Sequence, residues 1–294
     1  MKRLLMTLTL IFILCLSAFT LTACQGPHVH TFDNYVCECG VEDYTEGLQF
    51  IKTAEEDGYI LYGLGNAEDS SLVIPSTYKN LPVIEIGEEA FRNNKYINNI
   101  IILGNVRKIG NHAFSNCDSL ESIEIPDSVT SIGMGAFSNC DSLESIQIPA
   151  SVTSIGEGAF CLCYSLKLIS CEIESQPEDY YNLNGEGTSA SIAWGKTIVN
   201  LTQIEGLTYA LFSDATAMLI NAPQNVTNVI VKSEIIYNEE TYLITSIGEE
   251  SFDGCDFLQS IVISDNVTSI GGGAFYGCYR LVEVINKSEH ITVT

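Results

Sequence analysis

The sequence predicts a mostly β solenoid with short helical turns, wound in coils of 23 residues and divided into two modules. The first observation is a six-residue signature, Ile-Gly-x-x-Ala/Ser-Phe, which starts at Ile86, Ile109, Ile132, Ile155, Ile247 and Ile270. The second is a longer duplication, in which residues 47–84 correspond to residues 206–244, each ahead of a set of signatures. A fixed period of this length is typical of a solenoid, because each coil buries its apolar face only against its neighbours.

Residues 1–23 have the pattern of a leader peptide. Lys2 and Arg3 precede an uncharged apolar run, residues 4–21, and small residues follow. The sequence Leu-Thr-Ala before Cys24 resembles the lipobox of bacterial lipoproteins, which implies a diacylglycerol on the Cys24 thiol at the mature N-terminus. An uncleaved membrane anchor is one alternative, since 18 apolar residues barely span a bilayer. Ordinary signal-peptidase cleavage is another, and all three place residues 25–294 outside the cytoplasm.

The charge of the chain excludes one class of partner. Loss of residues 1–23 removes Lys2 and Arg3 and leaves 11 basic and 37 acidic residues, a net charge of −26. This charge repels phosphates, so we expect no nucleic-acid partner. It also repels an anionic membrane, and any membrane contact is expected through the lipid alone. Cations and basic protein surfaces suit the charge, although solubility explains it equally well.

Each element of a coil follows from its residues, as residues 120–140 illustrate. Ile123 and Ile125 alternate with polar residues, which indicates a strand with one buried face. Pro126 ends that strand, because it cannot donate to a ladder. A second short extended piece reaches Ile132, and the glycines that follow permit a tight turn or a single helical turn. One coil therefore stacks on the next at about 4.8 Å, the ladder spacing.

The organisation along the chain follows from these segments. We expect five parts: a leader at 1–23, a tether or small metal ribbon at 24–46, a first module at 47–171, a cap and linker at 172–205, and a second module at 206–294. Residues 47–84 and 206–244 are interpreted as caps or entry coils, which repeat arrays need to hide an apolar edge. Diverged coils remain an alternative for residues 172–205, since Ile155 and Ile247 lie four periods apart.

One repeat also carries a family resemblance. Residues 143–163 read Leu-x-x-Ile-x-Ile-Pro-x-Ser-Val-Thr-Ser-Ile-Gly-x-x-Ala-Phe-x-x-Cys and resemble the leucine-rich repeat of BspA-like surface proteins. The resemblance extends over about residues 47–286. It implies an extracellular leucine-rich repeat solenoid, without catalytic activity, that binds proteins or glycans in adhesion and in host or community contact. Residues 171–194 resemble the segment that often closes such an array, and no such segment follows residue 285.

Five cysteines occupy one position of the repeat, three residues after its Phe: Cys117, Cys140, Cys163, Cys255 and Cys278. Buried thiols that fill a turn explain this column. Disulfides between adjacent coils are the alternative, because neighbouring Cα atoms lie within range. Parallel side chains rarely meet the torsion that a disulfide requires, which favours free thiols. Cys171 falls at an inward strand position and is expected in the core.

One cluster has metal-ligand chemistry: His28, His30, Cys37 and Cys39. Two imidazoles and two thiolates suit tetrahedral zinc. Zinc knuckles usually space their cysteines by two to four residues, however, and here only Glu38 intervenes. A flexible tether with incidental residues is the alternative.

The candidate binding face consists of outward strand positions that align from coil to coil: Asn99, Ile101, Ser122, Glu124, Ser145, Gln147, Leu168, Ser170, Ser260, Val262, Glu283 and Ile285. Ile101, Leu168 and Val262 are apolar where a solvated strand prefers polar residues, which indicates a contact surface. Packing against flanking loops explains them as well.

The sequence shows no pairing of a nucleophile with a base, so we expect no enzymatic activity. The favoured hypothesis is a surface-anchored lipoprotein whose two leucine-rich repeat modules bind an extracellular protein or glycan. A structural spacer or assembly protein of the cell envelope is the second hypothesis. A metal-responsive module built on residues 28–39 is the third.

Overall fold

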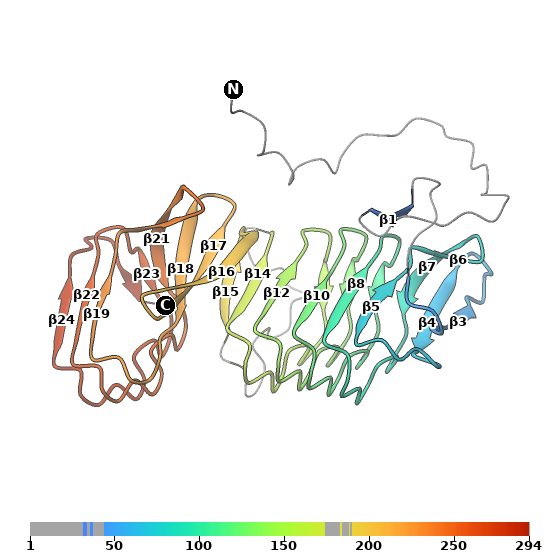
Figure 1. Ribbon diagram of the computed structural model, residues 1–294, viewed down its shortest axis with the longest axis horizontal. Helices are drawn as coiled ribbons and strands as arrows, with labels where there is room; N and C mark the ends of the chain where they lie inside the picture. The colour runs from blue at the N-terminus through green and yellow to red at the C-terminus, as the bar shows by residue number, and fades with distance from the viewer. Residues whose placement is uncertain are drawn as a thin grey trace, which may run out of the picture. The chain divides into compact units, whose positions relative to one another are not determined.

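The structure is a computed structural model that describes residues 32–33, 36–37, 44–173, 183, 188 and 190–293. Tyr44–Thr294 forms one compact unit, and Met1–Asp43 forms another. In the latter, β1 (Phe32–Asp33) pairs antiparallel with β2 (Val36–Cys37). Everywhere else in the described part, strands alternate with turns in stacked coils, which confirms the predicted solenoid (Figure 1).

Long strands line one side of the coils in the first module. They pair in parallel as two three-stranded sheets, β5–β8–β10 and β12–β14–β15. Their bounds are β5 (Ser71–Ile74), β8 (Asn99–Ile102), β10 (Ser122–Glu124), β12 (Ser145–Ile148), β14 (Leu168–Cys171) and β15 (Ser191–Trp194). Successive strands pair in register at the repeat spacing, Ser122 with Asn99 and Ser145 with Leu168.

Short strands form a second ladder in the same coils. After a hairpin of β3 (Gln49–Lys52) and β4 (Tyr59–Gly63), the chain adds β7 (Leu81–Ile86), with β6 (Thr77–Tyr78) paired to it. Parallel pairing then continues through β9 (Lys108–Ile109), β11 (Ser131–Ile132) and β13 (Ser154–Ile155). These strands end at the Ile of the signature, so the signature marks the corner of each coil.

The second module repeats this plan with a longer entry. The antiparallel strands β16 (Ile198–Ile204), β17 (Leu207–Phe212) and β18 (Thr216–Asn221) lead into β21 (Glu240–Ile247), which also pairs with β20 (Glu234–Tyr237). Its short ladder continues with β23 (Ser269–Ile270) and β25 (Thr292–Val293). Its long strands are β19 (Asn228–Val231), β22 (Ser260–Ile263) and β24 (Glu283–Asn286).

The segment 172–205, expected as cap and linker, includes β15, which pairs with β14, and all of β16, which pairs with β17. Residues 174–182, 184–187 and 189 lie outside the described residues. The predicted domain boundaries stay predictions.

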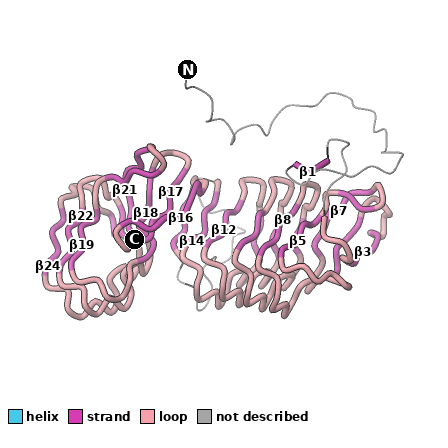
Figure 2. Tube along the Cα trace, viewed as in Figure 1, coloured by secondary structure: helices cyan, strands magenta, loops and turns pink. Residues whose placement is uncertain are grey.

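The described residues contain no helix (Figure 2), so the turn after each signature is the tight-turn alternative and not the short helical turn. Ala136 N donates to Gly133 O at 3.3 Å within the coil. Phe137 N instead donates to Ala159 O of the next coil at 2.8 Å. Because alternate N–H groups reach a neighbouring coil, they are not available for the i to i−4 bonds of a helix.

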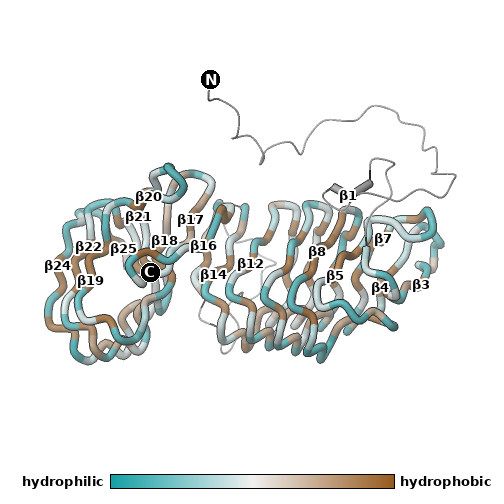
Figure 3. The backbone as a smooth tube through the Cα atoms, in the orientation of Figure 1, coloured by the Kyte–Doolittle hydropathy of each residue, from teal (hydrophilic) through white to brown (hydrophobic). Residues whose placement is uncertain are grey.

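The core of the first module is a column of stacked aromatic rings. Ring centroids lie 5.2 Å apart between Phe91 and Phe114, 5.3 Å between Phe114 and Phe137, and 5.5 Å between Phe137 and Phe160. Apolar stretches recur along the strands of successive coils (Figure 3) and fill the space around these rings. Each coil therefore buries its apolar face against the coils on both sides.

The glycine of the signature is required by the close approach of two coils. A Cβ atom on Gly133 would lie 2.6 Å from Asn111 N, and one on Gly156 would lie 2.4 Å from Met134 N. No carbon atom fits at such distances from backbone, so any side chain would push the coils apart. The glycine therefore keeps neighbouring coils at ladder spacing.

The five cysteines of the column are free thiols, which agrees with the core interpretation of that column: Cys117, Cys140, Cys163, Cys255 and Cys278. Cys117 Sγ donates to Phe91 O at 3.3 Å, and Cys140 Sγ donates to Phe114 O at 3.2 Å. Each thiol thus satisfies the carbonyl of the repeat Phe one coil earlier. Burial raises the pKa of Cys117 and of Cys171 to about 12, because the buried thiolate would lose its hydration.

The two modules meet at β17 and β18, which carry buried residues on both faces. One face packs into the core of the second module through Tyr209 and Leu219. The other face, with Ala210 and Phe212, packs against Leu168 of the first module. These strands therefore join the apolar cores of the two modules.

Candidate binding surface

The structure brings the proposed face residues together in rows along the long strands. In the first module, Asn99 aligns with Ser122 and Ile101 with Glu124 across β8 and β10. Ser145 aligns with Leu168 and Gln147 with Ser170 across β12 and β14. In the second module, Ser260 aligns with Glu283, and Val262 aligns with Ile285. The repeat spacing alone therefore placed these residues in register.

Three of the twelve residues offer no free surface. Ile101 is 8 % exposed, and Leu168 and Ser170 are fully buried. Leu168 lies in the apolar cluster under β17 and β18, which explains why this outward position is apolar. The hydroxyl of Ser170 donates to Lys196 O. At Leu168 the structure therefore favours packing within the protein over contact with a partner.

Several polar side chains of the first module's face are satisfied by other groups of the protein. Asn99 Nδ2 donates to Ser71 Oγ at 3.1 Å, and Ser122 Oγ donates to Asn99 Oδ1 at 2.6 Å. Gln147 Nε2 donates to Glu172 Oε1 at 2.8 Å. Gln147 Oε1 accepts from the Ile198 N–H at 3.0 Å, which ties the face to β16. Gln147 is thus a structural residue at the junction of the modules.

The second module's face is more apolar and more exposed. Ile230, Val262 and Ile285 lie opposite one another on β19, β22 and β24. Ile230 is 66 % exposed, Ile285 is 43 % exposed and Val262 is half-buried. Sequence reasoning missed Ile230, although the match between residues 71–75 and 228–232 placed it in the same row as Val262. Three aligned apolar side chains on an open sheet face form a small apolar row.

Comparison with protein families identifies the repeat. Residues 71–183 and 227–294 match the BspA type leucine-rich repeat region in six copies. This chain belongs to the BspA-type leucine-rich repeat family. The family assignment agrees with the resemblance of residues 143–163.

Solved structures of other leucine-rich repeat proteins are similar to this chain. The leucine-rich repeat protein of T. pallidum is 22 % identical, with 84 % of this chain and 83 % of that chain covered and a TM-score of 0.40. A leucine-rich cell surface protein of Faecalibacterium prausnitzii A2-165 is 25 % identical, with 92 % and 79 % covered and a TM-score of 0.35. A comparison with curated proteins found no match.

The remaining sites expected in this BspA-type chain fall mainly outside the described residues. The lipidation site Cys24 lies there, as do His28, His30 and Cys39 of the possible zinc cluster. Cys37 lies in β2, of which only the backbone is described. Elsewhere in the described part, no group of three His, Cys, Asp or Glu side chains is placed to hold a metal ion. No helix in the ranges that the structure describes is long and apolar enough to cross a membrane.

Proposed function

We propose that this chain is a non-enzymatic, extracytoplasmic lipoprotein that binds an extracellular protein or glycan through the outer face of its long strands. The leader and the lipobox-like sequence before Cys24 support export and a diacylglycerol anchor. Membership of the BspA-type family supports a repeat surface used for binding. The F. prausnitzii protein is a cell surface protein, which supports the same location for this chain.

The observation that carries the proposal is the exposed apolar row of Ile230, Val262 and Ile285. Exposure of three aligned aliphatic side chains to water is unfavourable, and a partner that covers them would gain about 25 cal/mol of binding free energy for each Å² of apolar surface buried. Outward positions of a solvated strand are usually polar, as Ser122 and Glu124 are in the first module. An aliphatic row favours a protein ligand over a glycan.

A binding screen of the full-length protein against extracellular-matrix proteins, mucins and glycans tests the proposal. We expect saturable binding to one target and at least a ten-fold weaker affinity in the Ile230→Arg variant. The matched control is Ile236→Arg, because Ile236 on β20 is 68 % exposed and lies outside the row. Equal loss in both variants, or no effect of Ile230→Arg, would remove the row as the binding site.

Lipid anchoring has its own test. We expect that cells given an alkyne-labelled fatty acid incorporate it into the protein and lose this label in Cys24→Ser. Cys15→Ser is the matched control, since Cys15 lies inside the apolar run of the leader. Label that persists in Cys24→Ser would contradict the anchor and leave the two other leader hypotheses.

A spacer or assembly protein of the envelope remains the second hypothesis. It predicts no saturable ligand and no effect of Ile230→Arg. It also predicts an assembly defect in cells that lack the protein.

A further inference from the structure

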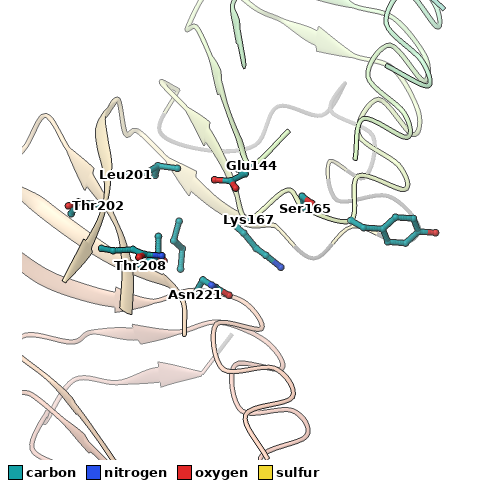
Figure 4. A pocket seen from close by; sticks show the side chains of 10 residues that line it. Glu144, Ser165, Lys167, Leu201, Thr202, Thr208 and Asn221 are labelled. Atoms are coloured by element: carbon teal, nitrogen blue, oxygen red, sulfur yellow. The ribbon is translucent and has the colours of Figure 1, made fainter. Parts of the chain in front are cut away.

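A polar pocket lies where the two modules meet, beside the apolar cluster around Leu168. Its volume is about 420 Å³, within the range of small-ligand sites. The first module contributes Glu144 and Lys167, and the second contributes Gln203, Thr208 and Asn221 (Figure 4). None of these residues belongs to the proposed face, so the pocket is a separate feature.

The second module's wall is a row of neutral hydrogen-bonding groups. Gln203 pairs with Thr208 across β16 and β17, and Thr208 pairs with Asn221 across β17 and β18. The three side chains therefore lie side by side on one face of the sheet. In the part of the chain that the structure describes, one side-chain hydrogen bond involves this row, from Gln203 Nε2 to Thr208 Oγ1 at 3.5 Å. Two amides and a hydroxyl are left to bind a ligand that both donates and accepts.

The first module's wall contains the half-buried ammonium group of Lys167, for which the described residues provide no ion pair. Among the described lysines and arginines, only Lys167 and Lys196 are half-buried. Lys196 pairs with Asp214, whereas no described carboxylate forms an ion pair with Lys167. Figure 4 shows the Lys167 and Glu144 side chains pointing in different directions. Partial burial of an unpaired charge costs free energy, which an anionic ligand group would offset.

We propose that this pocket binds an acidic saccharide, a polyhydroxylated sugar that carries one carboxylate. The carboxylate pairs with the Lys167 ammonium. Ring hydroxyls donate to and accept from the Gln203, Thr208 and Asn221 side chains, and Glu144 accepts from a further hydroxyl. The Glu144 carboxylate disfavours ligands of higher negative charge, such as sugar phosphates, because Lys167 is the one cation among the described residues that line the pocket.

Calorimetric titration of the full-length protein in detergent with galacturonate, glucuronate and N-acetylneuraminate tests this proposal. Galactose is the neutral control, and free glutamate is the control for a small carboxylate without hydroxyls. We expect at least one acidic sugar to bind at least ten-fold more tightly than both controls. Lys167→Met should weaken that binding by ten-fold or more, whereas Lys167→Arg keeps most of it.

The matched control variant is Lys287→Met, because Lys287 is an exposed lysine without a described ion pair and lies far along the chain in the last coil. Thr208→Val, which changes one hydroxyl to a methyl, should weaken sugar binding without loss of the circular dichroism spectrum. Absence of acidic-sugar binding, equal binding of galactose, or unchanged affinity in Lys167→Met would overturn the proposal. Ile230→Arg should leave sugar binding unchanged, so failure of the face and failure of the pocket are distinguishable.

Discussion

Phe137 in the first module and Phe275 in the second occupy the same place in the signature, yet their surroundings differ. Phe137 is fully buried, with a stacked ring on each side at 5.3 and 5.5 Å. Phe275 is only half-buried, and among the described rings it stacks on Phe252, at 5.3 Å. The last coil is also more exposed along its long strand, since all four residues of β24 are exposed.

The difference teaches that a repeat motif specifies the shape of a coil but not its stability. A coil of the first module buries apolar surface against two neighbouring coils, whereas the last coil of the second module buries it mainly against one. In a solenoid the free energy of unfolding is approximately a sum of coil and interface terms. We therefore expect identical substitutions to cost more in the first module than at the end of the second.

Removal of the repeat aromatic ring should give the largest contrast. Phe137→Ala leaves a cavity inside a complete stack and should lower the free energy of unfolding by about 3–5 kcal/mol. Phe275→Ala should cost about half as much or less, because the ring is partly solvated in the native protein. Urea unfolding of the two variants measures both values. Equal costs would mean that the last coil is as tightly packed as the central ones.

Substitution of the signature glycine should rank second. Gly133→Ala places a Cβ atom 2.6 Å from Asn111 N, inside a coil held on both sides, and should cost about 1–3 kcal/mol. Gly271→Ala meets Glu249 N at 2.4 Å but lies near the exposed coil, which can shift, so we expect a smaller cost. Gly104→Ala is the control, since no atom lies within 4 Å of its added Cβ. Thermal unfolding would contradict this reasoning if Gly104→Ala were the most harmful of the three.

The buried thiol of Cys117 in the first module predicts that the stability of the protein depends on pH. Burial raises the pKa of Cys117 from 9.0 to about 12, so the folded protein keeps a proton that the unfolded chain releases above pH 9. The stability contributed by this thiol is complete below pH 9 and is lost as pH rises toward 12. Between pH 8 and pH 10 the wild-type protein should lose about 1 kcal/mol more stability than Cys117→Ala.

Cys278 provides the comparison for this measurement. Burial also raises its pKa, but the side chain is only partly covered, so Cys278→Ala should change the pH profile less. Parallel profiles for wild type and Cys117→Ala would show that this thiol is not the source of the alkaline loss.

The smallest expected effect is a gain in stability. Leu162 has a φ of 61°, at the position where the two preceding coils place Asn116 and Asn139, both with a φ of 58°. A left-handed backbone disfavours leucine, and Leu162→Asn should stabilise the protein by about 0.5–1 kcal/mol. The second module has Gly254 and Gly277 at this position and leaves no equivalent gain. A melting temperature unchanged or lowered in Leu162→Asn would contradict the strain argument.

The solenoid could be predicted from the sequence because its determinants repeat locally. Three patterns recur at the same period: the signature, the alternation at Ile123 and Ile125, and the cysteine column. The interpretation of one coil is therefore supported by the same pattern in the others. The nature of the turn was harder to predict. Both a tight turn and a helical turn satisfy the same glycines, and the choice depends on hydrogen bonds such as Phe137 N to Ala159 O, which join different coils.

The junction of the modules could not be predicted, because it is built from residues that do not repeat. Leu168 looks like an outward apolar residue until β17 and β18 cover it. Gln147 looks like a solvated polar residue, yet it binds the Ile198 N–H, 51 residues further on. The pocket residues Lys167 and Asn221 belong to different modules, and no periodicity relates them.

The thiol column also bears on how such a chain can change its length. Cys117, Cys140 and Cys163 each donate to the carbonyl of a Phe 26 residues earlier, at 3.3, 3.2 and 3.0 Å. Because these successive coils of the first module present the same acceptor, excision or duplication of 23 residues in frame among them would rejoin equivalent donors and acceptors. A gene that encodes this array can therefore lengthen or shorten its protein by whole coils, each unit being compatible with either neighbour.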